Sequence, residues 1–407
     1  MFLDLSPFRK YPHFRKLYAG QLVSYIGTMI TYVALPYQVY HLTNSSFAVG
    51  LIGLVQLVPI LFTAFLGGAY ADAVDRKKIL LVAEALLAIC SGLQAWNASL
   101  ASPKIWIVYA VAALASAING FHRPAHQSIL PRLIAKEDIP AVSALGSLRS
   151  NLASIGGPAI GGLILARFGL GTAYLVDVVS FAFSFSMIAA LPSILPTGEK
   201  KSPSLQTIRE GISYAKSRQE LIGTYAVDFI AMIFGMPNAL FPAMAAGYGG
   251  AKVLGWFYSA PSIGALVATL FSGNLKKVKR HGAGVIVAAL VWGVAIILFG
   301  AIHNLWIALF FLGVAGAADM VSVVYRFTIW NETIPDRLRG RLAGVEMLSY
   351  LSGPMLGNVE SGMVAAATTT AFSVISGGVL CVVFVGLSVV WLPKFWSYHS
   401  DKVPIEA

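Results

Sequence analysis

Two acidic side chains lie inside long apolar segments of this 407-residue chain, where their chemistry suits proton transfer. Asp228 lies about 12 Å into the segment 221–246 at the rise of an α-helix. Asp319 lies in the segment 304–330, seven residues before Arg326, so these two side chains share a helix face. Charged groups at membrane depth are costly and face a cavity or a partner. Asp228 and Asp319 are therefore proton-coupling candidates, and an interhelical hydrogen bond is the alternative for Asp228.

Two arginines in the same setting need negative charge nearby. Arg149 lies about 15 Å into the segment 139–166. It needs either an anionic partner or an anionic ligand, and the sequence favours neither. Arg326 lies near the end of its segment, where a structural pair or an inner gate is favoured over substrate binding.

Polar and adaptable side chains on two segments could line a substrate cavity. Gln21, Tyr25, Thr28 and Tyr32 recur at helical spacing, a pattern that lines a cavity or makes ordinary helix contacts. The segment around Asp228 adds a flexible apolar wall, because methionine adapts to varied shapes. Such a lining suits a bulky amphiphilic molecule. The substrate-cavity candidates are Gln21, Tyr25, Thr28, Tyr32, Arg149, Tyr225, Met232 and Asn238.

The composition places these segments in a lipid bilayer. The chain is 57% hydrophobic and only 12% charged, against about 25% charged residues in soluble domains. A spanning helix needs about 20 mostly apolar residues. The pattern predicts an all-α polytopic membrane protein with twelve transmembrane helices. They lie near 17–40, 47–71, 78–98, 105–128, 139–166, 171–191, 221–246, 253–274, 283–302, 304–330, 341–365 and 370–393.

The positions of lysine and arginine predict the orientation of these helices. Basic residues gather in alternate loops, whereas the loops on the opposite side carry Lys104, Arg167 and Lys252 alone. Since basic loops stay in the cytoplasm, we expect both termini to be cytoplasmic. The same distribution over short loops argues against a nucleic-acid-binding surface, despite the net charge of +11.

A long polar segment at 192–220 divides the predicted helices into two groups of six. We expect a six-helix bundle at 1–191, a cytoplasmic linker at 192–220, a second bundle at 221–394 and a cytoplasmic tail at 395–407. Apolar residues recur at helical spacing in SLQTIREGISYAKSRQE (204–220), which predicts an amphipathic surface helix.

The two groups also carry similar sequences. HRPAHQSILPRL can be laid over YRFTIWNETIPDRL at a shift of 204 residues, and GGPAIGG (156–162) resembles SGPMLGN (352–358). Internal duplication of this kind is typical of secondary transporters, whose substrate sites lie between the repeats.

The loop GGAYADAVDRKK (67–78) concentrates charge between two apolar segments. Its glycines allow helices to pass closely. Asp75 is well placed to cap the third predicted helix. The basic residues that follow hold the loop in the cytoplasm against anionic lipid.

This loop, the six-plus-six pattern and the central linker together resemble the major facilitator superfamily. FHRPAHQSILPRLIAKEDIPAVSAL (121–145), LGWFYSAPSIGAL (254–266) and IPDRLRGRLAG (334–344) resemble the bacterial exporter branch that includes enterobactin exporters. The resemblance implies a cytoplasmic latch that holds the two halves together, with a simple topology anchor as the alternative reading. The latch residues it implies are Gly68, Asp72, Asp75, Arg76, Lys77, Arg123, Arg326 and Glu346.

A second motif implied by the resemblance lies in the fifth predicted helix. Gly157, Pro158, Gly161 and Gly162 form a Gly-Pro-x-x-Gly-Gly pattern that the family associates with antiporters. Proline removes a backbone donor and kinks a helix, and small residues permit close packing. A leak-resistant contact is the favoured interpretation, and generic helix packing is the alternative.

Together these features predict a proton antiporter that exports small organic molecules across the bacterial inner membrane by alternating access. The expected cargo is drug-like amphiphiles or siderophore-type metabolites, moved by a monomer in contact with protons and membrane lipid. An uptake symporter and a non-transporting receptor or channel are the alternatives.

Catalysis and bound cofactors are not expected. The sequence has no HExxH, P-loop or clustered His/Asp constellation, so we predict that the protein is not an enzyme. His122 and His126 share a helix face but lack a third ligand nearby, so no metal site is expected.

Overall fold

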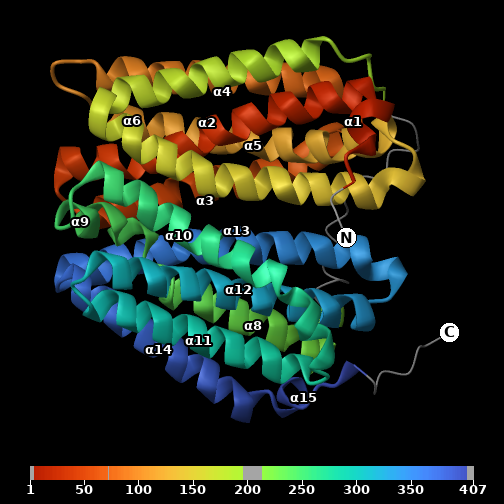
Figure 1. The fold of residues 1–407 in the computed structure, drawn as a ribbon, viewed down its shortest axis with the longest axis vertical. Coiled ribbons are helices and arrows are strands. Elements are labelled where there is room, and N and C mark those ends of the chain that lie inside the picture. Colours follow the sequence, from red (N-terminus) through yellow and green to blue (C-terminus); the bar gives the residue numbers. More distant parts are fainter. Residues whose placement is uncertain (1–3, 72, 196–212, 401–407) are drawn as a thin grey trace. The chain divides into compact units, whose positions relative to one another are not determined.

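The computed structural model describes residues 4–71, 73–195 and 213–400 (Figure 1). The latch candidate Asp72 and most of the predicted amphipathic helix at 204–220 lie outside these ranges. Residues 213–217 are helical. Here the Tyr214 hydroxyl donates to the carbonyl of Thr333 at 2.8 Å, and Ala215 is buried.

The regular elements in the described ranges are all helices. In the first half these are α1 (Ser6–Lys10), α2 (Pro12–Thr43), α3 (Ser46–Ala71), α4 (Arg76–Ala98), α5 (Ile105–Leu133), η1 (Lys136–Asp138) and α6 (Ile139–Ala189). In the second half they are α8 (Gln219–Phe234), η2 (Asn238–Leu240), α9 (Phe241–Ala246), α10 (Ala251–Leu270), η3 (Ser272–Lys277), α11 (His281–Ala301), α12 (Leu305–Thr333), α13 (Asp336–Ala367), α14 (Thr370–Trp391) and α15 (Pro393–Trp396).

Nine helices within the described residues are long and apolar enough to cross a membrane. The segment Lys136–Ala189 is 54 residues long, and α6 is broken within it at Gly169, whose φ is 79°. That left-handed conformation favours glycine, which has no Cβ to clash. A loop predicted between two spans is thus reduced to a break at a single residue.

The chain forms two compact units. Unit 1 comprises Met1–Asn44, Leu54–Ser202 and Ala245–Ser259, and unit 2 comprises Ser45–Gly53, Pro203–Met244 and Ala260–Ala407. Each unit therefore combines most of one half of the sequence with a short segment from the other half. The domain boundaries expected from the sequence stay a prediction.

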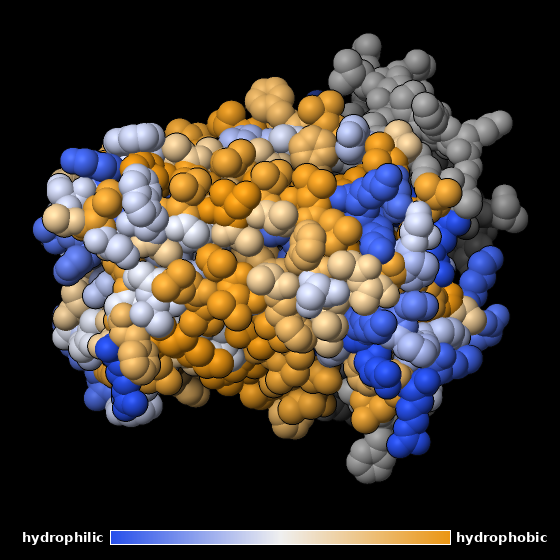
Figure 2. All heavy atoms as spheres, turned by 90° about the horizontal axis from the view of Figure 1, so that it is seen from above, coloured by the Kyte–Doolittle hydropathy of each residue, from blue (hydrophilic) through white to orange (hydrophobic). Residues whose placement is uncertain are grey.

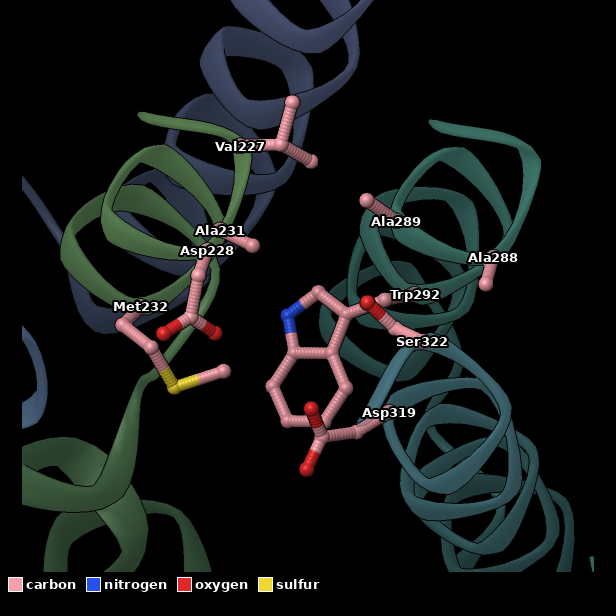
Figure 3. Close-up of a pocket in the computed structure, with 9 residues that line it drawn as sticks. All are labelled: Val227, Asp228, Ala231, Met232, Ala288, Ala289, Trp292, Asp319 and Ser322. Carbon is pink, nitrogen blue, oxygen red and sulfur yellow. The ribbon is translucent and has the colours of Figure 1, made fainter. Parts of the chain in front are cut away.

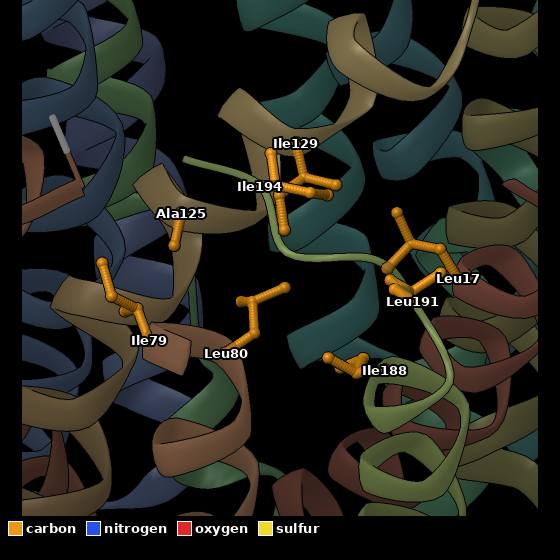
Figure 4. Close-up of a cluster of buried hydrophobic side chains, with 8 residues drawn as sticks. All are labelled: Leu17, Ile79, Leu80, Ala125, Ile129, Ile188, Leu191 and Ile194. Carbon is orange, nitrogen blue, oxygen red and sulfur yellow. The ribbon is translucent and has the colours of Figure 1, made fainter. Parts of the chain in front are cut away.

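In unit 1, α6 packs along α2 and α4, and α4 also packs on α5 (Figure 1). A buried cluster joins these helices to the segment after α6 (Figure 4). Its members are all aliphatic, so burial of apolar surface holds this end of the unit together. They are Leu17, Ile79, Leu80, Ala125, Ile129, Ile188, Leu191 and Ile194.

The outer surface of α4 shows how these helices meet lipid. Val82, Leu86, Ile89, Leu93 and Trp96 follow one another at helical spacing, and all are exposed. Figure 2 shows a face on which hydrophobic side chains spread across the middle and hydrophilic ones gather toward the two ends. An exposed apolar band of this kind is stable in hydrocarbon.

In unit 2, α11 packs on α12 and α14, and α8 contacts α11, α13 and α14. Helices α10 and α12 approach through glycine. A Cβ placed on Gly264 would collide with the carbonyl of Gly313, and one placed on Gly316 would collide with the carbonyl of Pro261. The absence of side chains therefore sets the distance between these two helices.

The charged loop before α4 is anchored within unit 1. The Asp75 side chain accepts from the amide of Lys77 at 2.9 Å, which confirms its predicted capping role. It also accepts from the hydroxyl of Ser193 at 2.6 Å and the amide of Ile194 at 3.1 Å. Lys77 Nζ donates to the carbonyls of Ala189 and Leu191. The start of α4 is thereby joined to the residues that follow α6.

Replacing Asp75 is expected to weaken this joint. Burial raises the pKa of its carboxyl, but the hydrogen bonds from Ser193, Ile194 and Lys77 outweigh burial and hold the pKa below its ordinary value. Asp75→Ala removes the cap and should lower the free energy of unfolding by about 1–2 kcal/mol at pH 7. Thermal unfolding of the purified protein in detergent would measure this.

The pH dependence of stability provides the check. A lowered pKa in the folded state contributes stability above the unfolded-state value of about 4, and that contribution is lost as the pH falls through the folded value. The stability gap between the unchanged protein and Asp75→Ala should therefore narrow below about pH 4. A gap that stays constant down to pH 3 would contradict the role assigned to the ionised carboxylate.

Candidate functional site

An ion triad lies inside unit 2 and joins α8 to α12. Arg326 Nη1 is paired with Asp228 Oδ1, and Arg326 Nη2 lies 3.6 Å from Asp319 Oδ1. Arg326 and Asp228 are largely enclosed, with side chains 8% and 12% exposed, whereas Asp319 is 38% exposed. One guanidinium therefore bridges an enclosed carboxylate and an accessible one.

The local fold explains why these three groups meet. Asp319 and Arg326 are seven residues apart on α12, so the shared face predicted from the sequence is confirmed. Asp228 reaches the same point from α8, and this pairing was not predicted. Two opposite charges at similar depth in different segments would have been the signal for it, because each is costly without the other.

The two aspartates of the triad line a small pocket between α8, α11 and α12 (Figure 3). Both carboxylates project toward the indole of Trp292, whose Nε1 donates to the carbonyl of Gly235 at 3.0 Å. The flexible side chain of Met232 lies beside Asp228. The other lining residues are Val227, Ala231, Ala288, Ala289 and Ser322. The pocket is thus apolar except for its acidic groups and Ser322.

Further candidates from the sequence lie in unit 2. Glu346 is within electrostatic range of Arg326 and Asp228. Tyr225 stacks on Trp330 with ring centroids 5.5 Å apart, and Trp330 Nε1 donates to the hydroxyl of Thr224 at 2.8 Å. Asn238 is half-buried in η2. Glu346 and Arg326, both assigned to the latch from the sequence, therefore belong to the surroundings of this site.

A second polar cluster lies in unit 1 and joins α2, α4 and α5. Glu84 is fully buried, and its Oε1 accepts from Gln21 Nε2 at 3.0 Å. His122 Nε2 lies 3.2 Å from the same oxygen. The ring of His122 stacks on that of His126, which lies 3.5 Å from Arg149 Nη1 on α6. The sequence placed His122 and His126 on one helix face, but their approach to Glu84 and Arg149 was not predicted.

Asp177 forms a separate buried centre in unit 1. Its carboxylate accepts from the hydroxyls of Thr31 at 2.7 Å, Ser91 at 2.8 Å and Ser180 at 3.2 Å. These donors come from α2, α4 and α6. The centre therefore joins three helices through hydrogen bonds.

The residues of the predicted stripe on α2 differ in their exposure. Gln21 is 8% exposed and faces Glu84, whereas Tyr32 is 43% exposed and meets the ring of Tyr258 edge-on at 5.1 Å. Tyr25 and Thr28 are half-buried between them. The open part of the stripe therefore lies toward Tyr32, away from Gln21.

The glycine and proline motif in α6 is a site of close packing in unit 1. A Cβ on Gly157 would collide with Met29 on α2, and one on Gly161 would lie 3.1 Å from the backbone of Ile30. A Cβ on Gly162 would meet Gly255 of α10 at 2.9 Å. Pro158 lies inside α6 between these contacts. The motif therefore brings α6 against two helices at once.

The remaining latch candidates lie at the start of α4 and beyond. The amide of Arg76 donates to the carbonyl of Ile194 at 3.2 Å. Gly68 belongs to α3, and Arg123 is exposed on α5. A search of the described residues finds no group of three His, Cys, Asp or Glu side chains able to hold a metal ion.

Comparison with known proteins decides the family. Residues 3–404 match the family described as transmembrane secretion effectors. The chain belongs to this family, a branch of the major facilitator superfamily. The chain is 25% identical over 377 residues to the enterobactin exporter EntS of Shigella boydii serotype 18, covering 92% of this chain and 91% of that protein. It is 24% identical, over the same length and coverage, to EntS of Escherichia coli O1:K1.

Solved structures of other transporters share the fold. A POT family transporter in complex with 5-aminolevulinic acid superposes with a TM-score of 0.75 at 11% identity, covering 95% of this chain and 97% of that one. The nucleoside transporter NupG superposes with a TM-score of 0.66 at 16% identity, covering 96% and 100%. The family match confirms the predicted superfamily, and the chain is a multi-pass protein of the bacterial inner membrane.

Proposed function

We propose that this protein is a secondary active transporter that exports small amphiphilic organic molecules from the bacterial cytoplasm in exchange for protons. The observation that carries the proposal is the triad of Asp228, Arg326 and Asp319 beside an apolar pocket. Intramembrane ionisable residues usually mark ion or substrate pathways. The 25% identity to an enterobactin exporter supports the direction of transport.

The triad can couple a proton to a change in packing. A proton that binds Asp319 forms an O–H bond and removes one of the two negative charges that face Arg326. Arg326 then pairs with Asp228 alone, so the electrostatic interaction between α8 and α12 changes. Release of the proton restores the original pairing. The accessibility of Asp319 makes it the first acceptor, and Asp228 is the second.

Alternating access needs two groups of helices that rock against each other, and in this chain we expect six helices in each. The broken α6 is long enough for two crossings, and α2 and α13, each 32 residues long, coincide with two further predicted spans. Together with the remaining apolar helices, these would complete the set of twelve. We place both termini in the cytoplasm on the distribution of lysine and arginine.

The packing motifs fit the same cycle. We propose that Asp75, Arg76 and Lys77, with Asp72, act as a latch that keeps the cytoplasmic side of the protein closed in one state of the transport cycle. The motif at Gly157–Gly162 would keep α6 closely packed and limit leakage of protons. The protein would need no cofactor and would act as a monomer on its small-molecule substrate.

Proton-coupled uptake is the second candidate function. Solved structures with this fold include a POT family transporter in complex with 5-aminolevulinic acid and the nucleoside transporter NupG. The same triad could bind a proton and a substrate on one side and release both on the other. The direction of substrate movement separates this candidate from export.

Inside-out vesicles with an acidic interior would test the proposal. Lipophilic cations, neutral drugs and catecholate siderophores would be added in turn, and proton release would be recorded by dye fluorescence. We expect release with one compound class, and a fall of at least tenfold in Asp228→Asn and Asp319→Asn. Glu137→Gln is the matched control, because this carboxylate lies exposed in η1.

The outcomes separate the hypotheses. Release that persists in both aspartate variants would remove the triad from proton coupling. Substrate accumulation driven by an acidic exterior in right-side-out vesicles would favour uptake. A folded protein that moves no compound in either direction would overturn the transporter assignment in favour of a receptor.

A further inference from the structure

Arg149 occupies an unusual position in unit 1. It lies near the middle of the first part of α6, half-buried, and its Nε is enclosed without a hydrogen-bond partner in the described part of the chain. Within the described ranges, its hydrogen-bond contact is from Nη1 to His126 Nε2, at 3.5 Å. A guanidinium has five N–H donors. Most of its hydrogen-bonding capacity is therefore open to another group.

The acidic side chains of unit 1 at membrane depth are already engaged elsewhere. Glu84 accepts from Gln21 and lies against His122. Asp177 accepts from three hydroxyls. The ion pairs found in the described residues do not include Arg149. No carboxylate in the described part of the chain is therefore paired with Arg149.

The groups around Arg149 are suited to an organic anion. The hydroxyl of Tyr25 on α2 is within electrostatic range of its guanidinium, and so is that of Tyr18, which itself donates to the carbonyl of Leu145 at 3.1 Å. Leu152, three residues further along α6, lies on the same face and is 49% exposed. A cation with a planar donor fork thus lies near two tyrosine hydroxyls and an exposed apolar side chain. Carboxylates match that fork with two parallel hydrogen bonds.

We propose that Arg149, with His126, Tyr18 and Tyr25, forms a subsite for the carboxylate of an aromatic or amphiphilic organic anion. This inference rests on the proposed transport function and specifies its substrate class. The carboxylate of the anion supplies the negative charge that pairs with Arg149, and the apolar part of the anion covers Leu152. Strongly hydrated inorganic anions fit poorly, because they would lose water without gaining apolar contact.

Direct binding to the full-length protein in detergent tests the subsite without a proton gradient. Naphthalene-2-carboxylate would be compared by calorimetry with naphthalene-2-carboxamide and 2-naphthylmethylamine, which share its ring but are neutral and cationic. We expect the carboxylate to bind at least tenfold more tightly than either. Arg149→Gln should remove this preference, and Arg149→Lys should retain part of it. Arg167→Gln is the matched control, because Arg167 lies exposed on the same helix.

Each outcome decides the proposal. Equal binding of carboxylate and carboxamide, or unchanged carboxylate binding by folded Arg149→Gln, would overturn the subsite. If Arg149→Gln does not fold, a carboxylate preference unchanged in Arg149→Lys would overturn it instead. The protein could also bind the carboxylate in detergent and yet release no protons in vesicles. That result would support the subsite and refute only proton antiport.

Discussion

Arg326→Leu is expected to lower the free energy of unfolding by about 3–5 kcal/mol and to abolish transport. The substitution removes the cation between Asp228 and Asp319, so two carboxylates face each other in an apolar setting. Removing one partner of a buried pair leaves an uncompensated charge, which costs more than the pair itself contributes. Unfolding in detergent and substrate-dependent proton release in vesicles would measure the two effects.

A double-mutant cycle separates the lost pairing from other effects of leucine. Asp228→Leu with Arg326→Leu removes both buried charges and should recover at least half of the stability lost in Arg326→Leu. Transport should stay absent in both variants. Arg167→Leu, on the exposed part of α6, should unfold like the unchanged protein. If the double variant is as unstable as the sum of the single variants, the two side chains are not coupled.

Gly316→Ala is expected to destabilise unit 2 by about 2–3 kcal/mol. The added Cβ would collide with the backbone carbonyl of Pro261, which cannot move as a flexible side chain can. Alanine normally stabilises a helix relative to glycine by up to about 1 kcal/mol, so the collision must outweigh a favourable propensity. Thermal unfolding of the purified variant would measure the net effect.

Gly313→Ala, one helical turn away on α12, is the matched control. Its Cβ would meet the carbonyl of Ala260 at 3.8 Å, an ordinary contact. We therefore expect this variant to be as stable as the unchanged protein or slightly more stable. Equal destabilisation by both alanines would mean that the α10–α12 distance is not set by Gly316.

The helices were predictable because hydrocarbon imposes a simple requirement on sequence. Every backbone polar group at membrane depth must be satisfied within the segment, so a long apolar run becomes a helix. The cap at Asp75 was predictable from local chemistry, because an aspartate just before a helix accepts from the unpaired backbone amides of its first turn. Where a short connection was expected near 170, the chain turns at Gly169 with a single left-handed residue, a detail that hydropathy does not encode.

The partners of the buried charges were much less predictable. Helical periodicity placed Asp319 and Arg326 on one face, and the structure confirms it. Periodicity does not say which helix covers that face, so the approach of Asp228 from another helix was missed. The stripe that contains Gln21 left cavity lining and helix contact open for the same reason, and the Gln21 side chain makes a helix contact by donating to Glu84.

Each unit contains segments that are far apart in the sequence, and this affects how the protein can fold during synthesis. Unit 1 includes Ala245–Ser259, so it is not complete when a ribosome finishes the central linker at residue 220, and its last segment is synthesised only after further residues of unit 2. Unit 2 likewise includes Ser45–Gly53, which is synthesised near the start. Two polypeptides divided within the linker would each lack part of their own unit. They should therefore accumulate only when expressed together, each completing the other.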